Sequence, residues 1–345
     1  MFGKNLKHYR LMRRMSMKEL SEACGLSSMS ISYYESGKRN PDMETIKKLA
    51  SALGIRVIDF LSDRNENLVF DHREFRKLSK LSKREQEYVQ ESVEEYFSRF
   101  FAAVECLGGN PLPEAPATHS LKLSEDYHES AAVLRNFLGF QNCGPVDELT
   151  SVIENQGFLF LELNMDDDSF SGMNGAVNEY PYVVVNNNMR QERKRTTIVH
   201  ELAHLMFMLE SNESDIESMA TSIAGAFLIP DEDLYRRLGH RRTSLTKDME
   251  LICQEYGISM FLLIKRANQA GIINDSLARD FYIKASRSNL RQKEPNRVKK
   301  TEKSEMFKRL VLRAINEEDL SIERASELLK VPCSELQEYC GSLEV

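Results

Sequence analysis

The chain has 345 residues, of which 41% are hydrophobic and 29% are charged, proportions that indicate a soluble globular protein with two or three domains. No apolar run reaches the length of a membrane span, and residues 1–15 lack the apolar region of a signal peptide. The six cysteines include no CxxC pair, so we expect neither a disulfide framework nor a cysteine-rich zinc site, and we expect a cytoplasmic protein.

The net charge of −7 is unevenly distributed along the chain. Residues 1–62 carry 11 Lys and Arg against 6 Asp and Glu, and residues 284–313 carry 11 against 3. A basic end joined to an acidic body favours a polyanion such as nucleic acid as the partner of that end. A solvated basic face is the alternative interpretation.

Residues 4–62 are predicted to form five short helices. Ser16 and Glu19 have the spacing of a capping box, and Gly25 stands where a left-handed C-cap is needed. A third helix is expected over 27–36, a fourth from Asp42 or Met43, and a short fifth over 57–61.

This segment resembles the Cro/repressor-like (XRE) helix-turn-helix family. The resemblance is carried by Leu20, Ala23, Gly25, Leu26, Ser27, Ile31, Ser32, Tyr34, Glu35, Gly37, Arg39, Pro41, Leu49, Ala50 and Leu53. It implies that the third helix enters the major groove of double-stranded DNA and that two copies read two half-sites. The residues expected at DNA are Ser27, Ser28, Met29, Ser30 and Tyr33 at bases, and Lys38 and Arg39 at phosphates. Met17 replaces a glutamine common in the family, and a protein-interaction module without a DNA role is the alternative.

The rest of the chain is divided by two predicted linkers. Residues 66–107 have the pattern of a charged helix, and the Pro- and Gly-rich residues 108–120 mark a domain boundary. Helices are expected over 130–140 and 146–157, strands over 158–163 and 182–186, and further helices from about 191 to 271. A basic linker over 286–303 and two or three small helices over 304–340 complete the chain.

The segment TTIVHELAHLMFML, residues 196–209, places polar groups in a strongly apolar helix. Positions i and i+4 share a helix face, so His200 and His204 can present ring nitrogens to one cation. Glu201 projects beside that face, where it can accept a proton from the attacking water without binding the metal. Burying these three groups without a cation would be costly, so the pattern favours a metal site over a purely structural helix.

A third protein ligand is expected from the helix that follows. Glu217 shares a face of that helix with Ala220 and Ala224, whose small side chains allow a close approach to the HELAH helix. Glu213 and Asp215 are the alternatives. Two imidazoles and a carboxylate favour zinc (Zn2+), and Mn2+ or Fe2+ can occupy the same set.

Two further features of the site stay open at the level of sequence. Tyr180, Tyr182 and His240 are all candidates for the side chain that stabilises an oxyanion. The run Tyr182–Asn186 is interpreted as an edge strand, to which an extended peptide substrate could pair.

Residues 130–230 resemble the ImmA/IrrE family of metallopeptidases. The matching stretches are AAVLRNFLGF, VDELTSVIENQGFLFLEL, FSG, PYVVVNNNMRQERKRTTIVHELAHLMF and ESMATSIAGAFLIP. The resemblance implies a gluzincin-like endopeptidase with His200, His204 and Glu217 as ligands and Glu201 as base, acting on a helix-turn-helix repressor. The family's R-x-R-F-T-x-A-H-E and A-N-x-F-A patterns read RKRTTIVHE and ATSIA here, and we expect these departures to affect packing rather than ligands.

We therefore predict a mainly α protein with a small β-sheet (α+β). The expected parts are a helix-turn-helix domain (1–65), a charged helical segment and linker (66–124), a zincin-like metallopeptidase domain (125–285), and a basic linker with a C-terminal helical domain (286–345). The predicted function is a zinc-type endopeptidase fused to a DNA-binding domain, with a repressor or antitoxin-like regulator as substrate, a possible homodimer and no membrane partner. The alternatives are a non-cleaving metal-binding transcription regulator and an antitoxin that binds a toxin through the peptidase-like domain.

Overall fold

The computed structural model describes residues 1–61, 67–71, 81–166, 169–290 and 301–341, and the chain divides into two compact units. Unit 1 is formed by residues 1–112 together with 305–345, and unit 2 by residues 113–304. The predicted α+β class is confirmed. The structure groups the chain differently from the four predicted segments, because the C-terminal helices pack with the N-terminal part of the chain.

Unit 1 begins with four α-helices and a 3-10 helix. Their bounds are α1 (Phe2–Met12), α2 (Met17–Cys24), α3 (Ser28–Glu35), α4 (Met43–Leu53) and η1 (Val57–Leu61). Ser16 and Glu19 form the predicted capping box at the start of α2, and Gly25 ends that helix with a φ of 70°. A core that includes Leu6, Leu20, Ile31, Leu49 and Phe60 holds these helices together.

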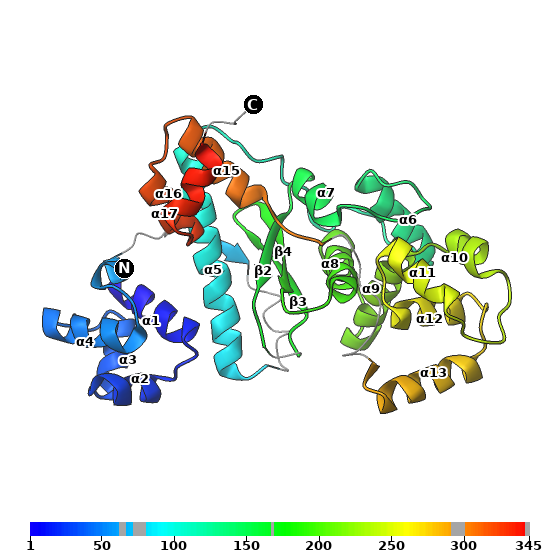
Figure 1. Ribbon diagram of the computed structural model, residues 1–345, viewed down its shortest axis with the longest axis horizontal. Helices are drawn as coiled ribbons and strands as arrows, with labels where there is room; N and C mark the ends of the chain where they lie inside the picture. The colour runs from blue at the N-terminus through cyan, green and yellow to red at the C-terminus, as the bar shows by residue number, and fades with distance from the viewer. Residues whose placement is uncertain (62–66, 72–80, 167–168, 291–300, 342–345) are drawn as a thin grey trace. The chain divides into compact units, whose positions relative to one another are not determined.

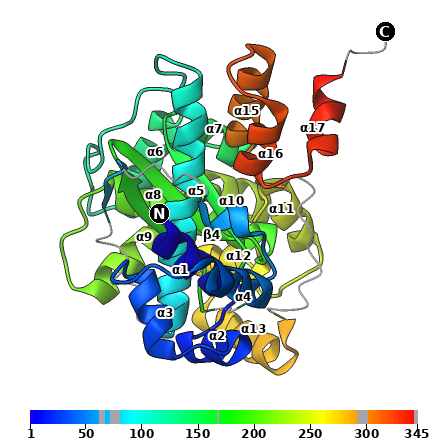
Figure 2. The same ribbon diagram turned by 90° about the vertical axis from the view of Figure 1, so that its left-hand side faces the viewer.

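The remainder of unit 1 consists of elements from both ends of the chain that pack together. Its elements are β1 (Phe70–Asp71), α5 (Lys83–Cys106), α15 (Met306–Asn316), α16 (Ile322–Leu329) and α17 (Cys333–Cys340). The helix predicted over 66–107 is corrected in part: residues 70–71 are extended, α5 begins after the cap residue Ser82, and 72–80 lie outside the described residues. The helices α15 and α16 pack on α5 (Figure 2), where the rings of Phe100 and Phe307 lie 5.4 Å apart.

Within unit 2, three strands lie side by side in the order β3-β4-β2. These are β2 (Leu159–Leu163), β3 (Gly172–Val177) and β4 (Tyr180–Asn186), with β2 parallel and β3 antiparallel to β4. The prediction that Tyr182–Asn186 is an edge strand is wrong, because β4 has a hydrogen-bonded neighbour on both sides. β3 occupies a polar, glycine-containing stretch for which no strand is predicted.

The helices of unit 2 lie to one side of this sheet (Figure 1). Their bounds are α6 (Tyr127–Phe137), α7 (Leu149–Asn155), α8 (Gln191–Met206), α9 (Glu213–Leu228), α10 (Asp231–Leu238), α11 (Asp248–Tyr256), α12 (Met260–Gln269) and α13 (Asp275–Arg287). α8 carries the HELAH sequence and packs against α9 on one side and against β3 and β4 on the other. The core between α8 and the sheet includes Val183, Val185, Ile198 and Leu202.

The Pro- and Gly-rich segment 108–120 contains the boundary between the units, at residues 112 and 113. Its second half is not a free linker. The backbone amides of His119 and Leu121 donate hydrogen bonds to the carbonyls of Leu205 and Met206, at 2.8 and 3.1 Å. These bonds fix the chain against the C-terminal end of α8.

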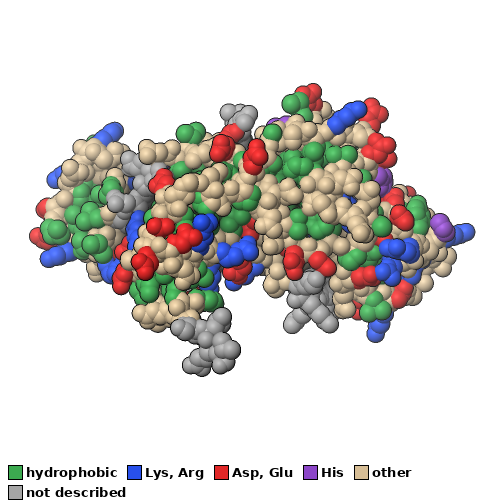
Figure 3. All heavy atoms as spheres, turned by 90° about the horizontal axis from the view of Figure 1, so that it is seen from above, with side chains coloured by type: hydrophobic (Ala, Val, Ile, Leu, Met, Phe, Trp, Pro, Cys, Tyr) green, Lys and Arg blue, Asp and Glu red, His purple; other side chains and the backbone are tan. Residues whose placement is uncertain are grey.

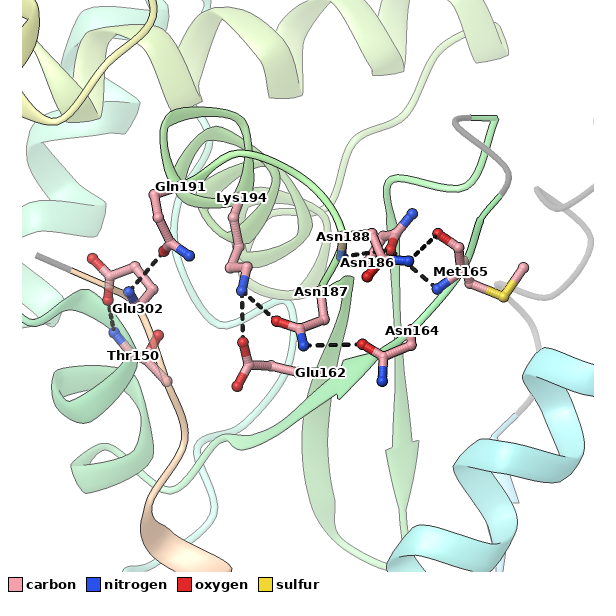
Figure 4. Close-up of polar contacts among 10 residues, drawn as sticks. All are labelled: Thr150, Glu162, Asn164, Met165, Asn186, Asn187, Asn188, Gln191, Lys194 and Glu302. Atoms are coloured by element: carbon pink, nitrogen blue, oxygen red, sulfur yellow. Dashed lines mark hydrogen bonds and ion pairs between the residues drawn. The ribbon is translucent and has the colours of Figure 1, made fainter. Parts of the chain in front are cut away.

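A buried lysine fixes the N-terminal half of α8 to the sheet. The Nζ atom of Lys194 lies 2.6 Å from a carboxylate oxygen of Glu162 and 3.0 Å from the side-chain oxygen of Asn187 (Figure 4). Glu162 belongs to β2, and Asn187 follows β4. Because the ammonium is buried, this ion pair holds α8 to the ends of two strands.

Glu302 fixes the same half of α8 from another direction. Its buried carboxylate pairs with Arg195 and accepts a 2.9 Å hydrogen bond from the amide of Thr150, while its own amide donates to Gln191 (Figure 4). The predicted basic linker over 286–303 is therefore corrected at both ends, because α13 continues to Arg287 and Glu302 belongs to a buried network. Residues 291–300 lie outside the described residues.

None of the described helices combines the length and the apolar character needed to cross a bilayer. On the face shown in Figure 3, acidic, basic and hydrophobic side chains are interspersed.

Candidate metal centre and DNA interface

Two histidines of α8 and one glutamate of α9 converge on a single point. The Nε2 atom of His200 lies 3.1 Å from one carboxylate oxygen of Glu217, and that of His204 lies 3.3 Å from the other. The two Nε2 atoms are 3.1 Å apart, and all three donor groups lie within 4.8 Å of one another. One turn of α8 separates the histidines, so the spacing of the sequence produces this geometry directly.

The hydrogen bonds around His200 define which ring nitrogen carries the proton. Thr221 donates its hydroxyl hydrogen to the carbonyl oxygen of Glu217 at 2.7 Å, and the same hydroxyl lies 3.3 Å from Nδ1 of His200. A hydroxyl has only one hydrogen, so it accepts on the side of the imidazole, and Nδ1 carries the proton. Nε2 of His200, which faces His204 and Glu217, is therefore the nitrogen left to bind a metal.

The carboxylate of Glu217 is held in its charged form. Hydrogen bonds from His200 and then from His204 hold the pKa of Glu217 well below its usual range. The alternatives Glu213 and Asp215 lie exposed in the first turn of α9, where Asp215 is bonded to Asn212. They do not belong to the cluster formed by the described residues.

The donor set fits a divalent cation of the zinc type. Two imidazole nitrogens and a carboxylate converge, which is the number and type of protein ligands that catalytic zinc sites use beside a water in the fourth position. The two Nε2 atoms and the carboxylate of Glu217 lie close enough together for one cation to contact all three. Such a cation supplies Lewis acidity to a carbonyl and to water.

Glu201 is buried and its orientation is fixed by β3. The side-chain amide of Asn174 donates a 2.7 Å hydrogen bond to Oε2 of Glu201, and Asn174 is itself buried. β3 can approach α8 this closely because Gly172 has no side chain. A Cβ at position 172 would lie 2.5 Å from Cγ2 of Thr197 and 3.7 Å from Cγ of Glu201.

The three candidates for oxyanion stabilisation are not brought to this cluster by the fold. Tyr182 is paired with Gly175, next to the pair of Val183 and Asn174 that faces α8, so alternation places Tyr182 on the opposite face of the sheet. Tyr180 has the same parity and lies on that opposite face. His240 is exposed after α10 and stacks on Tyr235 with a centroid distance of 5.0 Å. Tyr180 and Tyr182 are therefore not placed to stabilise an oxyanion at this cluster.

Two residues that contact the predicted site escape prediction from sequence. Asn174 lies in a strand without an alternating pattern, and no spacing relates it to Glu201. Thr221 is visible only as a departure from the family's A-N-x-F-A pattern. The expectation that this departure affects packing alone is wrong, because the Thr221 hydroxyl contacts His200.

The residues expected at DNA are distributed unequally around α3. Ser27 caps the helix and accepts a hydrogen bond from the amide of Ser30, and Ser28 is half-buried with its hydroxyl 3.0 Å from that of Ser21 on α2. Ser28 therefore faces α2, contrary to expectation. Met29 and Tyr33 are the large side chains that α3 leaves exposed, at 65% and 40%.

Lys38 and Arg39 are exposed in the turn that follows α3. The guanidinium of Arg39 lies 6.0 Å from the ring centroid of Tyr34, which gives the side chain a partner close to the end of the helix. Both cations are thus solvent-exposed directly after α3, where phosphate contacts are expected of them.

Comparison with known proteins gives two separate matches along the chain. Residues 6–60 match the helix-turn-helix family, and residues 157–268 match the IrrE N-terminal-like domain. The fold and these matches define a helix-turn-helix domain joined to a peptidase-type domain. More particularly, the first domain is of the XRE type and the second is IrrE/ImmA-like, as the sequence predicts. The second match implies a metal cofactor.

Two curated relatives match the helix-turn-helix region. The cryptic phage CTXphi transcriptional repressor RstR of Vibrio cholerae is 28% identical over 68 residues, which are 20% of this chain and 61% of that repressor. The SPbeta prophage-derived uncharacterized HTH-type transcriptional regulator YonR of Bacillus subtilis (strain 168) is 36% identical over 61 residues, 18% of this chain and 56% of that regulator. The chain thus spans less than two thirds of either relative. No solved structure matches the chain.

Proposed function

We propose that unit 2 is a metal-dependent endopeptidase in which His200, His204 and Glu217 bind a Zn2+-type cation and Glu201 is the general base. The observation that carries this proposal is the convergence of the three donor groups within 4.8 Å, with Glu201 directly beside them on α8. A metal site without hydrolysis needs only the ligands, whereas Glu201 is also present, buried and oriented.

The side chains divide the chemistry between them. Asn174 engages Oε2 of Glu201, so the other oxygen is available to accept the proton of the attacking water. Glu201 then delivers that proton to the leaving amine. Thr221 orients His200, and Glu217 offers its charge to the cation from the opposite helix.

We also propose roles for the helix-turn-helix domain and for the substrate. The helix-turn-helix domain supports DNA binding, and we assign base contacts to α3 and phosphate contacts to Lys38 and Arg39, with two copies on two half-sites. Two relatives of this domain are named as a repressor and a transcriptional regulator. The proposed substrate is accordingly a helix-turn-helix repressor or an antitoxin-like regulator in the same cytoplasm.

Metal analysis combined with a cleavage assay tests the peptidase proposal. We expect about one metal ion per chain in the wild type and in Glu201→Gln, and a large loss in His204→Ala. His240→Ala, which removes an exposed histidine outside the cluster, should keep the metal. The wild type should cut a helix-turn-helix regulator encoded beside its own gene, and Glu201→Gln should not. Equal metal content in His204→Ala and wild type would reject the assigned ligands.

A further inference from the structure

The exposed face of α3 offers unusual chemistry for a helix that reads DNA. The eight residues of α3, SMSISYYE, include no Arg, Lys, Asn or Gln. These four are the side chains that bond bidentately to guanine or adenine in the major groove. The one charged residue, Glu35, is bound to Arg10 of α1 by two hydrogen bonds of 2.6 and 2.9 Å.

Hydroxyl groups at the start of α3 are already engaged within the domain. The Ser27 hydroxyl accepts from the amide of Ser30 and lies 2.9 Å from the Ser30 hydroxyl. The Ser28 hydroxyl lies 3.0 Å from that of Ser21. These hydroxyls already make contacts that cap α3 or join it to α2, so a base contact would have to share them.

Met29 and Tyr33 remain, one turn apart on the same outward face of α3. Met29 is 65% exposed and Tyr33 is 40% exposed, although both are large and mainly apolar. The apolar group that the major groove presents to such side chains is the C5-methyl of thymine. We propose that α3 selects its half-site through contacts of Met29 and Tyr33 with thymine methyl groups rather than through hydrogen bonds to guanine.

This inference rests on the proposed DNA binding and adds the class of base that is read. Affinity that does not depend on sequence is assigned to Lys38 and Arg39, which lie outside α3 and reach phosphates. The two contributions are therefore separable. Removing a cation weakens binding to all DNA, whereas removing Met29 changes which DNA is preferred.

The test begins with the full-length chain and a library of random double-stranded DNA. The sequence that the protein enriches is synthesised with each thymine replaced in turn by deoxyuridine, which lacks only the methyl group. At the positions read by α3 we expect the affinity to fall about four-fold per methyl, equivalent to about 0.8 kcal/mol. Thymines in the flanks should show no change.

Variants assign the effect to the two side chains. In Met29→Ala the penalty at one thymine should disappear, and Tyr33→Phe should keep the wild-type pattern because the ring remains. Met43→Ala is the matched control, since Met43 is 58% exposed at the start of α4 and outside α3. All three positions are exposed, so circular dichroism should show an unchanged fold.

The outcomes distinguish a failure of DNA binding from a failure of thymine-methyl recognition. If no sequence is enriched and no DNA is retained at low salt, the DNA-binding proposal itself fails. If a sequence is enriched but deoxyuridine substitution leaves affinity unchanged at every position, DNA binding stands and the reading of thymine methyl groups is overturned. A penalty that persists unchanged in Met29→Ala and in Tyr33→Ala would overturn it as well.

Discussion

Asn174 and Thr221 each contact a side chain of the proposed site on α8 from a different element. Asn174 reaches Glu201 from β3, and Thr221 reaches His200 from α9. Each makes a single hydrogen bond to its partner. The bond from Asn174 leaves the other oxygen of Glu201 available, and the bond with Thr221 places a proton on Nδ1 of His200.

Replacing Asn174 should separate catalysis from metal binding. In Asn174→Ala we expect the rate of peptide hydrolysis to fall about ten-fold or more, because Oε2 of Glu201 loses its donor and the carboxylate can rotate. Metal content should not change. The matched control is Asn164→Ala, an exposed asparagine that follows β2. Parallel measurement of kcat and bound metal checks the prediction, and a joint loss of both would contradict it.

Replacing Thr221, by contrast, should weaken metal binding itself. Thr221→Val keeps the shape but removes the bond to Nδ1 of His200, so metal affinity should fall about 10- to 100-fold, as for other partners of ligating histidines. Thr196→Val provides the control, since the Thr196 hydroxyl donates to the Glu192 carbonyl within α8, as that of Thr221 does to Glu217 within α9. Competition with a zinc-binding dye measures both affinities. Equal affinities would show that Thr221 does not set the orientation of His200.

At the scale of the element, the approach of β3 to α8 depends on Gly172. A methyl group at this position would lie 2.5 Å from Cγ2 of Thr197 and 2.8 Å from the carbonyl oxygen of Val184. Real Cβ atoms do not come this close, so the strand must move away from the helix. Movement of β3 would carry Asn174 away from Glu201.

Gly172→Ala should therefore destabilise unit 2 by about 1 to 3 kcal/mol, the usual cost of overpacking a core, and should reduce hydrolysis. Thr197→Ala removes the nearer clash, and the double variant should recover part of the lost stability. Urea unfolding of the four proteins gives the coupling free energy between the two positions. Strictly additive effects would show that the two residues do not meet.

Local patterns in the sequence were sufficient for α2, α8 and α9 but not for β3. The HELAH spacing predicts α8 and the proximity of His200 and His204, and Ala220 and Ala224 predict the approach of α9. Capping residues predict where α2 begins and ends. By contrast, β3 contains Gly172, Gly175 and Asn174, residues of low strand propensity, and its conformation comes from pairing with β4.

At the scale of the whole molecule, unit 1 is held together by ion pairs between distant parts of the chain. Glu95 of α5 pairs with Lys330, which follows α16, at 2.7 Å and with Arg99 at 2.8 Å. Burial would raise the pKa of Glu95, but the charges of Arg99, Lys330 and His8 together lower it to about 2. No pattern in the sequence predicts a pairing over such a separation.

The pH dependence of stability should report this pairing. The pKa of Glu95 is lower in the folded state than its ordinary value of 4.5, so its contribution is complete above about pH 4.5 and is lost as pH falls towards 2. The expected loss is about 3 kcal/mol across that window. Urea unfolding between pH 7 and 3 should show a flatter profile for Glu95→Gln than for wild type. Glu338→Gln, at an exposed position of α17, should leave the profile unchanged.

The covering of α5 by helices from the other end of the chain also fixes an order of events during synthesis. Arg99 donates to the carbonyl of Leu328, 229 positions later, so the aromatic face of α5 stays uncovered while the whole of unit 2 leaves the ribosome. At ordinary rates of translation, that interval lasts about 10 to 40 seconds. The helix-turn-helix core, made only from the first sixty residues, can close at once, whereas the aromatic face of α5 must wait for α15 and α16.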